Sequence, residues 1–139
     1  MEFDFNDAWI LNSITNTETE NDGAQLIDII AYCDYSNHSI ITISEINNSL
    51  DKLFFVNIIL IQNNKFSINN GNYKDWWKKY SEKKRIYIFK AVEETLKFLN
   101  KSFPEIVYRK SNLKVSESDY YLALEIYRQK ALEIITRMK

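Results

Sequence analysis

Between residues 40 and 69 the hydrophobic period changes once, from helical to strand-like spacing. The apolar residues of the helical part share one face: Ile46, Leu50, Leu53 and Phe54. Residues 58–62 and 65–68 then read as two strands on either side of Asn63-Asn64, a pair typical of tight turns. The pattern therefore predicts a helix that leads directly into a β-hairpin.

Boundary signals flank this predicted helix. Thr42 and Glu45 have the spacing of a capping box, in which each side chain bonds the other residue's backbone N–H. Ile41 and Ile46 are placed to form a hydrophobic staple across the cap. Asn57 is suited to a left-handed stop, because Asn tolerates that conformation better than most residues with a β-carbon.

Two further helices are predicted before residue 40. The first covers about residues 5–16, with Asp4 or Asn6 as its cap and an apolar stripe that includes Trp9. The second covers about residues 24–35.

The second of these helices is predicted to begin with a cap formed by Asp22 and Gln25. Ile40-Ile41 could then add a short third strand to the hairpin.

The second half of the chain is also mainly helical in pattern. A long helical region runs over about 73–101, with a break near Ser81 as an alternative. Residues 106–108 favour a short strand, and a last helix is expected over 117–137. Ser116 is its predicted cap.

The order of elements over residues 5–69 resembles the winged helix-turn-helix superfamily. Residues 34–53, with an aspartate followed by Asn-His and Ile before the third helix, also look like a group of uncharacterised bacterial winged-helix-like proteins, as does the pattern of 116–128. Winged helices commonly have Gly after the third helix, where this chain has Asn57. The resemblance implies a fold but no established activity.

We therefore expect a mainly α (α+β) fold. Residues 1–70 form an N-terminal winged helix with a two- or three-stranded wing, and residues 71–139 form a helical C-terminal extension packed on it. At 139 residues the two parts are expected to make one structural domain.

Composition favours a soluble, cytoplasmic protein. Apolar residues make up 45% of the chain, yet none of the apolar runs approaches the roughly 18 residues that a membrane span needs. The single cysteine, Cys33, excludes an internal disulfide framework and fits a reducing compartment.

The net charge of −1 conceals an uneven distribution. Residues 1–64 carry ten acidic residues and one basic residue, a balance of −9, whereas residues 65–139 have a balance of +8. Such asymmetry bears on partners rather than on fold.

If the protein bound DNA, the third helix would be the recognition helix. Its polar face is predicted to present Glu45, Asn47, Asn48, Asp51 and Lys52. Asn47 and Asn48 could read adenine, and Lys52 could contact phosphate. Glu45 and Asp51 would repel phosphates, however, so a solvated polar face is the competing interpretation.

Residues 65–90 supply the remaining candidate nucleic-acid contacts: Lys65, Lys74 and Lys78. A basic helix with interleaved aromatics could track a nucleic-acid backbone. The alternative is a solvated basic face whose Trp76, Trp77 and Tyr80 pack inward.

No enzyme, metal or cofactor chemistry is indicated. His38 and Cys33 lack the additional ligands that a metal site needs, so His38 is expected to be structural, at the start of the short strand. Cys33 falls on an apolar helix face and is expected to be an inert thiol. Two isolated glycines leave no phosphate-binding loop.

Two functions remain. The first is a DNA-binding winged-helix regulator of unknown target. The alternative is a winged helix used as a protein-interaction module that binds no DNA. The partner would be a basic protein that docks on the acidic half, or a second copy of the chain. Self-association through the oppositely charged halves is expected, with Trp76, Trp77 and Tyr80 as candidate dimer contacts.

Overall fold

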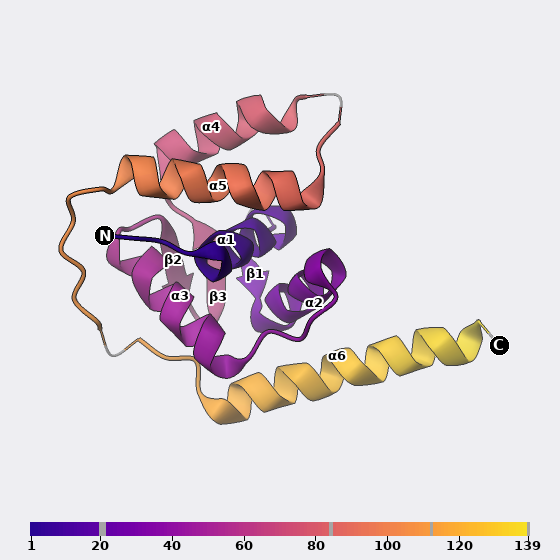
Figure 1. Ribbon diagram of the computed structural model, residues 1–139. Coiled ribbons are helices and arrows are strands. Elements are labelled where there is room, and N and C mark those ends of the chain that lie inside the picture. The colour runs from indigo at the N-terminus through magenta and orange to yellow at the C-terminus, as the bar shows by residue number, and fades with distance from the viewer. Residues whose placement is uncertain (20–21, 84, 112, 139) are drawn as a thin grey trace.

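The computed structural model describes residues 1–19, 22–83, 85–111 and 113–138. Over these residues the chain is mainly helical with one small antiparallel sheet, as Figure 1 shows. The helices are α1 (Phe5–Thr17), α2 (Leu26–Asn37), α3 (Ile43–Phe55), α4 (Gly71–Ser81), α5 (Ile88–Ser102) and α6 (Glu117–Arg137). The strands are β1 (Ala24–Gln25), β2 (Ile59–Gln62) and β3 (Lys65–Ile68).

Helix α1 is the centre of the fold. It contacts α2, α3, α5 and β3, and every residue from Asp7 to Ile14 is buried. Its buried polar side chains bond other helices: the Trp9 indole N–H donates to Ser36 Oγ of α2 at 2.9 Å, and the Asn12 amide donates to Thr95 Oγ1 of α5 at 2.7 Å. A single predicted stripe therefore understated how much of α1 is enclosed.

The sheet has the strand order β1-β3-β2, and both pairings are antiparallel. The hairpin register pairs Gln62 with Lys65 across the two-residue turn. Asn63 and Asn64 in that turn both have positive φ, 53° and 60°, as a type I′ hairpin turn requires. The predicted hairpin is confirmed.

The local signals around α3 are also confirmed. The Glu45 backbone N–H donates to Thr42 Oγ1 at 3.2 Å, and the Thr42 N–H donates to Glu45 Oε1 at 3.0 Å. Asn57 has φ 58°, the predicted left-handed stop. Asp4 caps α1 and Ser116 caps α6, in agreement with prediction.

The predicted third strand was wrong. Residues 40–41 are not in a strand, and the third strand is β1 instead. The Ile41 carbonyl accepts a hydrogen bond from the Tyr120 hydroxyl at 2.5 Å, so a side chain occupies the acceptor that a strand would have used. His38, expected at the start of that strand, is the left-handed C-cap of α2, with φ 52°.

The predicted start of the second helix was also wrong. Helix α2 begins at Leu26, after β1, and the Gln25 backbone N–H donates to the Asp28 side chain at 2.9 Å. The cap is therefore built from Gln25 and Asp28 rather than from Asp22 and Gln25. Pairing of Ala24 and Gln25 with β3 keeps these two residues out of the helix.

The helical region over 73–101 divides as the alternative anticipated. Helix α4 ends at Ser81 and α5 begins at Ile88. Residues 106–108, predicted as a short strand, are not in a strand; Tyr108 there bonds the side chain of Asp51 instead.

Candidate functional site: the polar face of α3

Helix α3 is held against the core by one apolar face. Ile46, Leu50 and Leu53 are all buried, and α3 contacts both α1 and β2. The opposite face of α3 carries Asn47, Asn48 and Asp51, and it is available for contact with other parts of the chain or with a ligand.

Asp51 faces neither solvent nor a phosphate position. Its carboxylate is buried and accepts hydrogen bonds from the Tyr108 hydroxyl and from both the backbone N–H and the hydroxyl of Ser111. Burial alone would raise the pKa of Asp51, but the bonds from Ser111 and Tyr108 outweigh it and hold the pKa below its ordinary value. Asp51 therefore anchors the connection between α5 and α6, residues 103–116, as an ionised acceptor.

Asn47 makes a second attachment to the same connection. Its Oδ1 accepts the Val115 backbone N–H at 2.7 Å, and its Nδ2 donates to the Val115 carbonyl at 3.3 Å. An Asn side chain that exchanges two bonds with one backbone unit is held facing that backbone, so it is poorly placed for a bidentate contact with a base. The α5–α6 connection thus occupies much of the readout face of α3.

Lys52 is turned inward, contrary to the predicted exposed position. Its Nζ lies 2.5 Å from Asp7 Oδ2 and 3.8 Å from Asp4 Oδ2, and its side chain is 16% exposed. Burial raises the pKa of Asp7 above its ordinary value, although Lys52 opposes the shift. Lys52 therefore serves as the counter-ion of a buried carboxylate.

The other candidate nucleic-acid contacts lie in different environments. Lys65 lies on β3, with its Nζ 3.2 Å from Asp22 Oδ1. Asn48 on α3 and Lys74 and Lys78 on α4 are exposed. Lys65 and Lys74 line one cavity, together with Glu18 and Asp22. Asn48 is apart from them, because α4 has only weak contact, at most, with α3.

The candidate dimer aromatics pack within the chain. The rings of Trp76 and Tyr80 stack with centroids 5.4 Å apart, and those of Trp76 and Phe98 lie 5.1 Å apart. Tyr80 is buried, and Trp76 and Trp77 are half-buried. Trp76 therefore joins α4 to α5, whereas the rings beside Trp77 belong to Tyr73, Trp76 and Tyr80 of its own helix.

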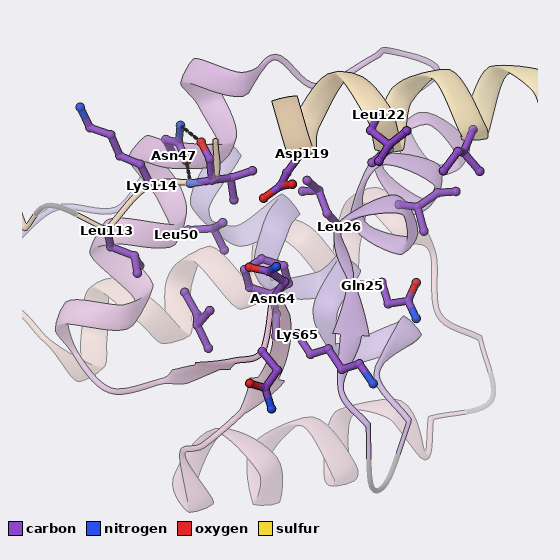
Figure 2. Close-up of a pocket in the computed structure, with 17 residues that line it drawn as sticks. Gln25, Leu26, Asn47, Leu50, Asn64, Lys65, Leu113, Lys114, Asp119 and Leu122 are labelled. Atoms are coloured by element: carbon purple, nitrogen blue, oxygen red, sulfur yellow. Dashed lines mark hydrogen bonds between the residues drawn. The ribbon is translucent and has the colours of Figure 1, made fainter. Parts of the chain in front are cut away.

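A cavity of ≈ 330 Å³ lies beside this face, where the first turn of α2, α3, the hairpin, residues 113–115 and the start of α6 meet. Figure 2 shows the Asp119 carboxylate pointing into the cavity and Lys114 pointing away from it. The volume is at the lower end of the range for small-molecule sites, about 300–1,000 Å³. Its lining mixes apolar side chains with several polar ones, among them Gln25, Asn64 and Lys65, and this mixture does not single out a ligand class.

Cys33 and His38 do not form a reactive pair. Cys33 is buried, and burial raises the pKa of its thiol to about 12. Over the described ranges, no three His, Cys, Asp or Glu side chains gather closely enough to hold a metal ion. Within the same residues, no helix combines the length and the apolar character that crossing a bilayer requires.

The anchoring residues Asp51, Tyr108, Ser111 and Val115 were not predicted as partners. Tyr108 and Asp51 are 57 residues apart, and Asn47 and Val115 are 68 apart, so no local spacing relates them. The one available signal was Asp51 itself, a carboxylate next to Leu50 at the edge of the apolar face.

Comparison with known proteins found no matching family model, no matching curated protein and no matching solved structure.

Proposed function

We propose that this protein is a non-enzymatic protein-interaction module whose first 70 residues are built as a winged helix. The winged-helix assignment is supported by the order of elements: α1, a short strand, α2, then α3 leading through Asn57 into the β2–β3 hairpin. The third strand pairs with the hairpin, as expected of a wing with three strands.

The observation that carries the proposal is the intramolecular use of the α3 readout face. Asn47 bonds Val115, Asp51 bonds Tyr108 and Ser111, and Lys52 pairs with Asp7. Of the residues proposed to read or contact DNA from α3, only Asn48 is left exposed. Duplex recognition by α3 would require the α5–α6 connection to leave, with loss of the bonds that Asn47 and Asp51 make to it.

Charge also disfavours a duplex near α3. The N-terminal 64 residues have a net balance of −9, and phosphate contacts by Lys and Arg supply most non-specific affinity for DNA. Helix α3 itself contributes one cation, Lys52, which is already paired with Asp7, so other phosphate contacts there would depend on Lys110 and Lys114 of the covering connection.

Positive support for an interaction role comes from α6. Its last part carries several exposed large apolar side chains: Leu132, Ile134, Ile135 and Met138. Clustered exposed apolar side chains usually mark an interaction site.

A second candidate function is duplex binding through α4. Lys74, Lys78 and Lys79 are exposed on this one helix, which is the arrangement a phosphate-tracking surface needs. The second candidate makes no use of α3.

Fluorescence anisotropy with a labelled random-sequence duplex, at low salt and with protein in excess, tests the proposal. We expect no saturable binding. Binding that is weakened by Asn48→Ala would contradict the proposal and restore α3 as a reader. Binding that is lost in the triple variant Lys74→Gln, Lys78→Gln, Lys79→Gln, with a reduced salt dependence, would favour the second candidate.

A further inference from the structure

Helix α6 carries a coiled-coil seam that only partly finds a partner within the chain. Alternating spacings of four and three residues relate its seam positions: Tyr120, Leu124, Tyr127, Ala131, Ile134 and Met138. The first half of the seam packs on α2. Tyr120 and Leu124 are buried, and the Tyr127 hydroxyl donates to Asp34 Oδ2 at 2.5 Å.

The second half of the seam has no such cover. Ile134 is 58% exposed and Met138 is 82% exposed, and the neighbouring Ile135 is 52% exposed. Figure 1 shows α6 running past α2 and away from the body toward the C-terminus. We call residues 128–138 the α6 tail. An isolated helix of this length is only marginally stable in water, so the tail is best stabilised by a partner.

The charges beside the seam decide what kind of partner fits. Arg128, Lys130 and Arg137 flank the seam, and Glu133 is the one acidic residue in the α6 tail. If two tails paired antiparallel, Lys130 and Arg137 of one copy would face the same residues of the other. Like charges at flanking positions disfavour that pairing, and an acidic surface is favoured instead.

Helix α2 offers such a surface. It contains no basic residue, and Asp28 is its carboxylate for a partner, because Asp34 already accepts from Tyr127 of the same chain. On its outer side Tyr35 is 68% exposed, and the Tyr32 ring lies 6.1 Å from it. This is also the helix on which the first half of the same seam already packs.

We propose that the α6 tail docks on the outer face of α2 of a second copy, and that the exchange is reciprocal. The inference rests on the proposed interaction function and names its partner. Each copy would contribute one tail and one α2 face, which gives a closed two-fold dimer with the same contact made twice. The apolar tail residues would cover Tyr35 of the partner, with Arg128 and Arg137 near the partner's Asp28.

The dimer is expected to be weak. The tail offers only a few large apolar side chains, and a standard stable interface buries about 1,600 Å² in total. We expect a dissociation constant of about tens of micromolar. Salt should weaken the dimer further, because part of the attraction is between opposite charges.

Sedimentation equilibrium at concentrations from micromolar to a few hundred micromolar tests the association. Ile134→Glu should weaken dimerisation by about tenfold or more, because it places a charge on the seam. Gln129→Glu is the matched control, since it adds the same charge to the same helix on the side away from the seam, and it should leave dimerisation within about twofold. Circular dichroism of each variant checks that α6 remains folded.

Disulfide trapping tests the geometry. A Tyr35→Cys variant is mixed with an Ile135→Cys variant under mild oxidation, and the buried Cys33 should stay unreacted. Heterodimers that form only in the mixture support docking of the tail on α2. Cross-linking of Ile135→Cys with itself alone would show tail–tail pairing and overturn the proposal.

A monomer at all concentrations, with no effect of Ile134→Glu, would also overturn the dimer. That result, with the DNA experiment still negative, would leave the interaction function standing with a different partner. Saturable DNA binding would instead remove the proposed function itself, so the two failures are distinguishable.

Discussion

Gly23 pairs with Thr19 in an isolated bridge and directly precedes β1. Its φ is +68°, a left-handed conformation that residues with a β-carbon rarely adopt. A β-carbon built there would lie 2.8 Å from the Phe66 carbonyl oxygen of β3. Backbone strain and this contact with an atom that cannot move aside act together. We expect Gly23→Ala to lower the free energy of unfolding by on the order of 2 kcal/mol or more.

Gly71 provides the control in urea melts of both variants. A β-carbon at Gly71 meets nothing within 4 Å, and the residue is the first of α4. Gly71→Ala should therefore be neutral or stabilising by up to about 1 kcal/mol. Equal losses from the two substitutions would mean that β1 does not hold the geometry described here.

Left-handed residues also show where single positions could be predicted. Asn57 was predicted from its place after an amphipathic helix, and it has φ 58°. His38 was not predicted, although it has φ 52° and ends α2 in the same way. Asn is a frequent left-handed residue, whereas His is a less common one, so the residue type gave a signal at the first site and little at the second.

At the scale of elements, the attachment of the α5–α6 connection to α3 can be tested with adjacent asparagines. Asn47→Ala removes both bonds to the Val115 backbone and leaves those groups unpaired, so it should cost about 1–2 kcal/mol of unfolding free energy. Asn48→Ala, at the next and exposed position, should change stability by less than about 0.5 kcal/mol.

Hydrogen exchange shows where in the chain Asn47→Ala acts. The Val115 amide should exchange faster in Asn47→Ala than in the unchanged protein, since its acceptor is Asn47 Oδ1. Unaltered protection of the Val115 amide in Asn47→Ala would show that the connection is held by other contacts.

The elements that could be predicted are those with local signals. The capping box of α3, the hairpin turn and the cap of α6 each lie within a few consecutive residues. The third strand and the α3 cover depend on partners far along the chain: Ala24 of β1 pairs with Phe66 across 42 residues, and Ser111 reaches Asp51 across 60. Hydrophobic periodicity cannot indicate which distant residues pair. The sequence therefore predicted the α3 residues of the candidate site but not the residues that cover them.

For the whole molecule, the division into acidic and basic halves overstates the charge left for partners. At least eight of the ten acidic residues before position 65 are used inside the chain, among them Glu18, Asp28 and Glu45, which accept backbone N–H groups. Asp4 and Asp7 pair with Lys52, and Asp22 pairs with Lys65. Asp34 bonds Tyr127, and Asp51 bonds Tyr108 and Ser111. The net balance of a segment therefore predicts less about docking than the charges of one exposed helix face.

The whole molecule consists of a packed body from which the α6 tail projects, and two leucines of α6 test this division. Leu124 is 6% exposed in the half that packs on α2, whereas Leu132 is 63% exposed in the tail. In dilute protein, where any dimer is dissociated, Leu124→Ala should cost about 2–4 kcal/mol because it opens a cavity in the core. Leu132→Ala should change the free energy of unfolding by less than about 0.5 kcal/mol. Urea denaturation measures both, and a large loss from Leu132→Ala in the monomer would mean that the tail folds back on the body.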